Sequence, residues 1–184
     1  MPNIRDAGTL QEKQFLLVGF PGSGKTTQFQ TLPGRKFLYV FDPNCLASLK
    51  GLDADYEIFC PEVMDLDLSV KSLKLKDGNI VGDKPSRAVE PKTYMNFERH
   101  FTEHFEKGFF KDYDVVGFDS FTMFADIVMD RVMHINKRLG KQPEQADWSA
   151  QIYTITNVFR CLWSTGGITF ATGHLDPKQD ETTT

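Results

Sequence analysis

The chain has 184 residues, of which 40% are hydrophobic, and its formal net charge is −4. A chain of this length can bury one hydrophobic core, so we expect a single domain over 1–184. A net acidic chain does not coat nucleic acid by bulk electrostatics, so any polyanion site must be local. Neither a secretory leader nor a membrane-spanning segment is indicated by the apolar pattern.

The cysteines are odd in number, far apart and in apolar surroundings. They are Cys45, Cys60 and Cys161. This pattern favours reduced core residues over a disulfide or zinc framework, and it predicts a cytoplasmic protein.

Five short apolar or β-branched runs bounded by turn residues predict five strands. They cover 15–20, 36–42, 56–60, 113–119 and 167–173. The runs lack the strict alternation of half-exposed strands, and helical patterns lie between several of them. The predicted fold class is therefore α/β, with a mostly parallel sheet flanked by helices.

Four segments have helical patterns. They are 25–32, 91–108, 120–140 and 147–166. Aromatic residues in the second segment form one apolar stripe, which predicts core packing. Glycines at the ends of the last three segments are typical of C-terminal caps: Gly108, Gly140 and Gly166.

One segment, about 69–90, does not follow the alternation of strands and helices. Asp77-Gly78 lies between short alternating runs, which predicts a β-hairpin insertion. Six basic and three acidic residues from Lys71 to Lys92 give a local charge of +3. An exposed strand face explains this charge most simply, and a contact with a nucleic-acid backbone is the alternative.

The stretch GFPGSGKT matches the P-loop pattern G-x-x-x-x-G-K-[ST] at every fixed position, between a predicted strand and a predicted helix. Glycines let successive backbone N–H groups face phosphate oxygens, which side chains would obstruct. Lys25 is suited to the β- and γ-phosphates, Thr26 to Mg²⁺, and Thr27 to the α-phosphate. The predicted cofactor-binding residues are Gly19, Phe20, Pro21, Gly22, Ser23, Gly24, Lys25, Thr26 and Thr27.

A P-loop needs an acidic partner at the end of another strand, the Walker B position. Asp119 in DVVGFDS fits it and is the second predicted metal residue beside Thr26. Ser120 can hydrogen-bond the water shell of the metal. Asp119 also fits a helix N-cap, and both roles can coexist.

Three further residues at predicted strand ends are candidate catalytic groups. Asp42 and Asn44 in FDPN follow the second strand, where Asp42 is a candidate base and Asp42-Pro43 equally fits an ordinary turn. His174 ends the last strand, at the edge where open α/β sheets bind ligands. A structural role for this histidine is the alternative.

With these motifs, the sequence resembles the RecA-like P-loop ATPases, and more closely the phage-encoded Sak type that assists single-strand annealing and recombination. The resemblance rests on GFPGSGKTT, FDPN, DVVGFDS, ADWSAQ and ITFATGH followed by DPKQDETTT. It implies a RecA-like fold, ATP and Mg²⁺ as cofactors, single-stranded DNA and further copies of the chain as partners, and a bacterial host cytoplasm. It also implies that His174 senses the γ-phosphate and that the tail after it contacts DNA.

The sequence departs from this family at two points. Asn44 stands where a catalytic glutamate is expected, so either Asp42 replaces it or hydrolysis is slow. The sequence ends at Thr184, where relatives continue with further strands, which favours a fragment. A nucleotide or small-molecule kinase, and a non-hydrolysing ATP-dependent switch, remain alternative functions.

Overall fold

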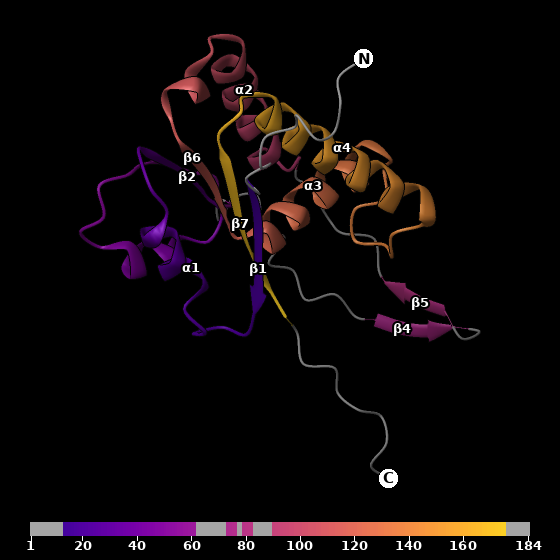
Figure 1. Ribbon diagram of the computed structural model, residues 1–184. Helices are drawn as coiled ribbons and strands as arrows, with labels where there is room; N and C mark the ends of the chain where they lie inside the picture. The colour runs from indigo at the N-terminus through magenta and orange to yellow at the C-terminus, as the bar shows by residue number, and fades with distance from the viewer. Residues whose placement is uncertain (1–12, 62–72, 77–78, 83–89, 176–184) are drawn as a thin grey trace, which may run out of the picture.

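The computed structural model describes residues 13–61, 73–76, 79–82 and 90–175. Its centre is a five-stranded sheet in the order β1-β7-β6-β2-β3, with every neighbouring pair parallel (Figure 1). The strands are β1 (Gln14–Gly19), β2 (Lys36–Val40), β3 (Asp55–Ile58), β6 (Val115–Asp119) and β7 (Ile168–His174). The sheet is flanked by helices, so the predicted α/β class is confirmed.

Among the described residues, four α-helices connect these strands. They are α1 (Lys25–Gln28), α2 (Thr93–Glu106), α3 (Phe121–Ile135) and α4 (Gln145–Ser164). Short 3-10 segments cover Phe29–Thr31, Pro43–Leu49 and Phe109–Asp112. Within the described residues, no helix combines the length and apolar character that crossing a bilayer requires.

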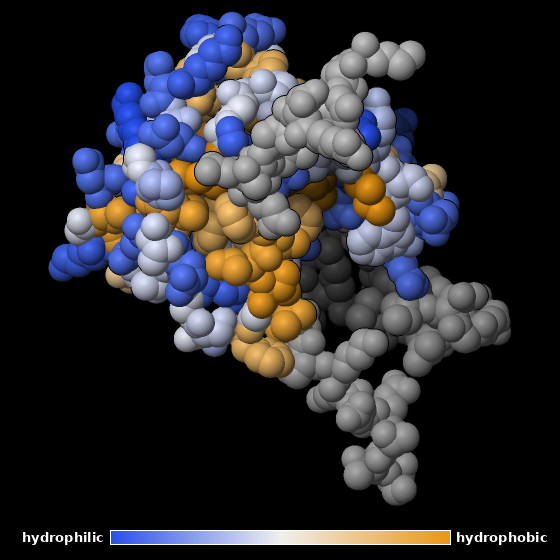
Figure 2. Space-filling model, viewed as in Figure 1, coloured by the Kyte–Doolittle hydropathy of each residue, from blue (hydrophilic) through white to orange (hydrophobic). Residues whose placement is uncertain are grey.

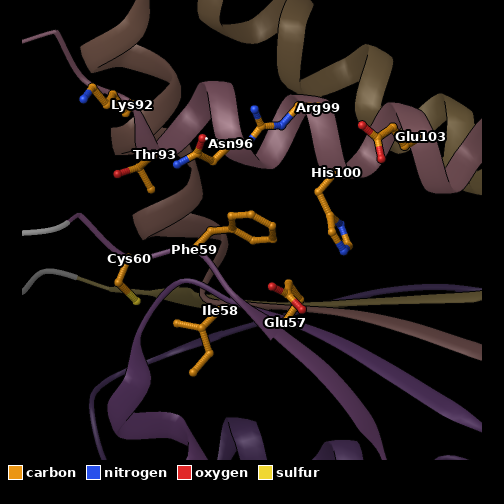
Figure 3. A pocket seen from close by; sticks show the side chains of 10 residues that line it. All are labelled: Glu57, Ile58, Phe59, Cys60, Lys92, Thr93, Asn96, Arg99, His100 and Glu103. Atoms are coloured by element: carbon orange, nitrogen blue, oxygen red, sulfur yellow. Dashed lines mark hydrogen bonds between the residues drawn. The ribbon is translucent and has the colours of Figure 1, made fainter.

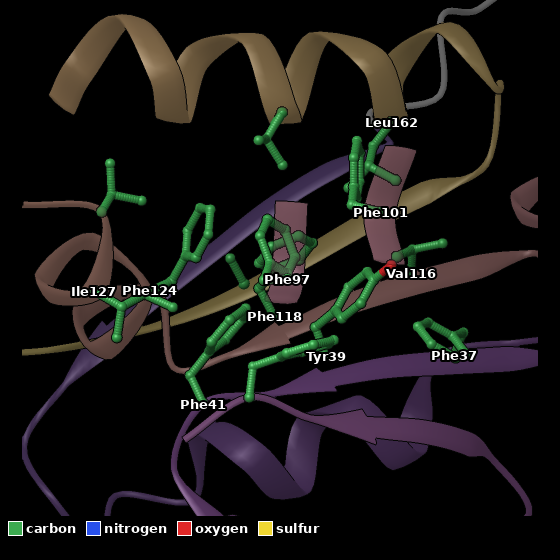
Figure 4. Packing of buried hydrophobic residues seen from close by; sticks show 14 of the residues in the cluster. Phe37, Tyr39, Phe41, Phe97, Phe101, Val116, Phe118, Phe124, Ile127 and Leu162 are labelled. Atoms are coloured by element: carbon green, nitrogen blue, oxygen red, sulfur yellow. The ribbon is translucent and has the colours of Figure 1, made fainter. Parts of the chain in front are cut away.

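Each face of the sheet has its own apolar cluster, because successive strand side chains point to opposite faces. Phe37, Tyr39 and Phe118 belong to the larger cluster, which α2, α3 and α4 cover (Figure 4). Leu38 and Phe170 belong to the smaller cluster, which Phe29 covers from the other face. β2 and β6 are buried at every position, as the unbroken apolar runs predict.

Two helices end earlier than the sequence predicts. The α-helical turn after the P-loop lasts only until Gln28 and tightens into the 3-10 segment. The third helix ends at Ile135 and not at Gly140, because the chain turns at Lys137, where φ is 55°. Asn136 and Arg138 then contact Asp147 in the first turn of α4, which holds the loop against that helix.

The predicted hairpin consists of β4 (Leu73–Lys76) and β5 (Asn79–Gly82), which pair antiparallel in a separate two-stranded sheet. Its tip at Asp77-Gly78 lies outside the described residues. So do three of the six basic residues on which its predicted contact with nucleic acid depends, Lys71, Lys84 and Arg87.

Gly117 in β6 lets Phe29 and Leu38 pack closely beneath the P-loop helix. A Cβ atom at this position would lie 2.6 Å from Leu38 Cδ1 and 2.7 Å from Phe29 Cε2. We expect Gly117→Ala to lower the free energy of unfolding by about 1–3 kcal/mol, because both neighbours must move. The matched control is Gly173→Ala, whose Cβ would meet Val18 Cγ2 at 3.6 Å. Equal losses for the two variants in denaturant unfolding would contradict this.

Candidate functional site

The P-loop, His174 and Asp119 meet at the carboxyl-terminal edge of the sheet, since all five strands run parallel. Gly19, at the end of β1, pairs in register with His174, at the end of β7. Asp119 ends β6, the next strand along. The chain thus brings together residues from three distant parts of the sequence, at the edge where α/β sheets bind ligands.

The P-loop has the backbone conformation that its glycines predict. Gly22 has φ 76° and Gly24 has φ 81°, both in the left-handed region that favours glycine. A Cβ atom on Gly19 would lie 2.9 Å from Ser23 Oγ. Ser23 donates its backbone N–H to the carbonyl oxygen of Phe20 at 3.2 Å. The loop is therefore a tight turn that larger residues at these glycines would distort.

Lys25 folds back over this loop. Its Nζ donates to the carbonyl oxygens of Gly19 at 2.8 Å and of Phe20 at 2.9 Å. These contacts hold the ammonium group beside the loop. The ammonium group can exchange a carbonyl oxygen for a phosphate oxygen, because a charged donor forms a stronger hydrogen bond with a charged acceptor.

Asp119 is only 4% exposed and binds two threonine hydroxyls. Thr26 Oγ1 donates to Asp119 Oδ2 at 2.5 Å, and Thr172 Oγ1 donates to Asp119 Oδ1 at 2.7 Å. The structure therefore joins the two residues that the sequence assigns to a metal. The N-cap of α3 is Ser120, whose Oγ accepts from the backbone N–H of Met123 at 3.3 Å, so the side chain of Asp119 is not needed for capping.

Asp42 and Asn44 follow the end of β2, which is the direct neighbour of β6 in the sheet. The carbonyl oxygen of Asp119 accepts the backbone N–H groups of Phe41, at 2.7 Å, and of Asp42, at 3.3 Å. Asp42 Oδ1 accepts two bonds from Asn44, from its backbone N–H at 3.0 Å and from Nδ2 at 2.9 Å. Asp42 thereby caps the 3-10 segment Pro43–Leu49, which is the turn arrangement that the sequence offers as an alternative.

His174 lies between the P-loop strand and α3. Its backbone N–H donates to Thr122 Oγ1 at 2.9 Å. Its Nδ1 is buried and has no hydrogen-bond partner among the described residues. A buried polar atom without a partner is unusual, and it belongs to the residue that pairs in register with Gly19, the first residue of the P-loop.

All three cysteines are free, and two of them follow strands of this sheet, Cys45 after β2 and Cys60 after β3. Burial, with smaller contributions from Asp119 and Asp42, raises the pKa of the Cys45 thiol to about 12. Burial also raises the pKa of the Cys60 thiol, which donates to the carbonyl oxygen of Phe41 at 3.2 Å. Both thiols stay protonated at neutral pH and are therefore poor nucleophiles. Of the three predicted core cysteines, Cys45 is buried, whereas Cys60 and Cys161 are half-buried.

A nucleotide and a magnesium ion fit the residues present at this edge. The loop offers backbone N–H groups and a lysine ammonium group, which bind phosphate. Thr26 and the buried carboxylate of Asp119 offer hard oxygen atoms, the ligands that Mg²⁺ prefers. Within the described residues, no group of three or more histidine, cysteine, aspartate or glutamate side chains forms a separate metal site.

Sequence reasoning missed two threonines at this site. Thr172 donates to the carboxylate of Asp119, and Thr122 accepts the backbone N–H of His174. The available signal for Thr172 was the presence of threonines, Thr169 and Thr172, inside the mostly apolar strand ITFATGH. A fully buried hydroxyl needs a partner, and the neighbouring strand supplies one.

A cavity of about 390 Å³ lies at the opposite edge of the sheet, between β3 and α2 (Figure 3). Its walls are mostly polar and include Asn96 and Arg99 from α2, Lys92 at the N-cap of that helix, and Glu57 from β3. Thr93, which is 7% exposed, also lines it. The cavity and the P-loop strand therefore lie at opposite edges of the sheet, since β1 and β3 are the two edge strands.

The strand order, together with the P-loop and Asp119 at the carboxyl-terminal edge of the sheet, defines a P-loop NTPase-like α/β domain. The comparisons with known proteins find no matching protein family and no significant match among curated proteins. Among solved structures, the chain is similar to a prototypical ATPase from the type III secretion system of pathogenic bacteria, with 11% identity and a TM-score of 0.45. That match covers 94% of this chain and 47% of the other, so the chain spans about half the length of that ATPase. None of these comparisons points to the Sak-type family.

Proposed function

We propose that the chain binds ATP with Mg²⁺ at the P-loop, hydrolyses it slowly, and acts on single-stranded DNA in phage-type annealing or recombination. The observation that carries the nucleotide part is the link between Thr26 of the P-loop and the buried Asp119. In this proposal, Lys25 binds the β- and γ-phosphates, and Mg²⁺ supplies charge neutralisation there. The DNA part rests on the resemblance of the sequence motifs, and the tail that would contact DNA lies outside the described residues.

The test is phosphate release from ATP by the full chain, with and without single-stranded DNA. We expect Mg²⁺-dependent release that single-stranded DNA increases and that duplex DNA of the same sequence does not. A rate that is the same with either DNA and without DNA would contradict the DNA part and leave the ATPase part standing. An undetectable affinity for ATP would contradict both.

His174 supports a link between nucleotide and DNA. Its Nδ1 is buried without a partner among the described residues, its backbone pairs in register with Gly19, and its backbone N–H donates to Thr122 in the first turn of α3. We propose that this imidazole senses the γ-phosphate and passes its state to the chain that follows.

The role of Asn44 is tested by Asn44→Glu. An amide side chain can orient water but cannot accept its proton, and a positioned general base typically contributes about 10²- to 10⁴-fold. If Asn44 stands at the position of a catalytic base, we expect Asn44→Glu to increase single-turnover hydrolysis with DNA present. Asp42→Asn should lower whatever activity remains. A fast wild-type rate with no gain from Asn44→Glu would leave Asn44 only its contacts with Asp42.

The contacts between these two residues also favour a second candidate, a nucleotide-dependent switch with little turnover. Asp42 Oδ1 is already bound twice by Asn44 and serves as an N-cap, so it is a poorly placed base. ATP binding without measurable phosphate release, with or without DNA, would support this candidate over the ATPase.

A nucleotide or small-molecule kinase remains a third candidate, because such kinases use the same P-loop. The polar cavity between β3 and α2 is not its acceptor site, since it lies at the opposite edge of the sheet from the P-loop strand. Candidate acceptor nucleotides should then lead to ADP formation with a phosphorylated product instead of free phosphate. Product analysis by mass spectrometry distinguishes the two reactions.

We also propose that the chain forms a homo-oligomer. The edge strand β1 exposes apolar side chains on both faces, with Phe15 38% exposed on one face and Leu16 55% and Val18 48% exposed on the other. Figure 2 shows apolar side chains gathered over this strand. A groove of about 290 Å³ between β1 and α4, lined by Leu16, Phe159 and Trp163, continues this surface. Light scattering of the full chain, with and without ATP, measures the assembly.

A further inference from the structure

We infer that Thr172 is a positioning residue for the metal site: it fixes the carboxylate of Asp119 so that the hydroxyl of Thr26 is oriented to bind Mg²⁺. This inference rests on the proposed nucleotide function and adds a residue to it. Its basis is the chain of two hydrogen bonds that runs from β7 through Asp119 to the P-loop.

The register of the sheet places these groups together. β6 and β7 pair Phe118 with Ala171, so the following residues, Asp119 and Thr172, are neighbours. Phe170 belongs to the apolar cluster on the P-loop side of the sheet, and Thr172, two residues later in the strand, points to the same side. Thr172 is completely buried, so water cannot replace its hydroxyl as a donor to the carboxylate.

The two threonines use different oxygens of the carboxylate. Thr172 donates to Oδ1 at 2.7 Å and Thr26 donates to Oδ2 at 2.5 Å. A partial rotation of the carboxylate would weaken both bonds, so Thr172 fixes the plane of the carboxylate relative to the P-loop. A carboxylate that accepts hydrogen bonds from two sides is held in one orientation.

The orientation of Asp119 determines how Thr26 is presented. A hydroxyl has one proton and two lone pairs. Because the proton of Thr26 is directed at Asp119 Oδ2, its lone pairs are free for a cation. Without Thr172, the carboxylate could turn, and the Thr26 hydroxyl would lose its fixed direction. Among the described residues, no lysine or arginine forms an ion pair with Asp119 that could hold the carboxylate instead.

The test compares Thr172→Val, which removes the hydroxyl at nearly constant shape, with Thr172→Ser, which keeps it. The measurement is the Mg²⁺ dependence of ATP affinity, by titration of a fluorescent ATP analogue with and without EDTA. We expect Thr172→Val to raise the Mg²⁺ concentration for half-maximal binding about tenfold or more, with metal-free affinity unchanged. Thr172→Ser should stay close to the wild type.

Thr169→Val is the matched control, because Thr169 is also buried in β7 but does not contact Asp119. A double-mutant cycle with Asp119→Asn separates positioning from general destabilisation. If Thr172 acts through Asp119, Thr172→Val has no further effect on Mg²⁺ dependence in the Asp119→Asn background. Should Thr172→Val fail to fold, Thr172→Ala enters the same cycle.

The inference is overturned if Thr172→Val weakens ATP binding equally with and without Mg²⁺. It is also overturned if Thr169→Val shifts the Mg²⁺ dependence as much, or if the effect of Thr172→Val persists in the Asp119→Asn background. A wild-type chain that binds no Mg-ATP would instead refute the proposed function itself, so the two failures are distinguishable.

Discussion

Lys25→Ala is expected to reduce ATP turnover by at least about 10²- to 10³-fold, and to weaken ATP binding, while the fold survives. The physical reason is that Lys25 supplies positive charge to phosphate and packs nothing in the core. In the structure its Nζ contacts only two carbonyl oxygens of its own loop among the described residues. The measurements are ATP affinity by calorimetry and phosphate release.

Lys50→Ala is the control for Lys25, because Lys50 is an exposed lysine outside the P-loop. It should leave both quantities unchanged. A folded Lys25→Ala protein with normal affinity and turnover would remove the P-loop assignment, and with it the whole proposed function.

Asp119→Asn is expected to have the second large effect, a loss of about 10²- to 10³-fold in Mg²⁺-dependent turnover with metal-free nucleotide binding little changed. The substitution removes the negative charge that would attract the ion and its water shell. It also places an amide NH₂, which cannot accept a bond, opposite one of the hydroxyls of Thr26 and Thr172.

The informative measurement is the Mg²⁺ titration of both binding and turnover. Equal losses with and without metal would mean that Asp119 is structural. Such a result could not be assigned to helix capping, since Ser120 caps α3. A thermal unfolding curve recorded without nucleotide shows how much of the loss comes from the fold.

Local sequence patterns were sufficient for most of the fold. Unbroken apolar runs predicted the buried strands β2 and β6, and the glycines of the P-loop predicted its left-handed residues. These features depend on short-range sterics and on burial, which leave a mark in consecutive residues. Helix ends were less accurate. The early end of α3 depends on contacts of Arg138 and Asn136 with Asp147, which no local pattern contains.

By itself, the sequence determined that the chain is α/β, that the P-loop follows the first strand, and that Thr26 and Asp119 are the candidate metal residues. Only the tertiary structure decided which strands are neighbours and in which register. The order β1-β7-β6 puts β7 between the P-loop strand and Asp119, and this brings Thr172 to the carboxylate and His174 to the P-loop. Strand order and register depend on long-range packing, and a shift of one residue would turn Thr172 to the other face of the sheet.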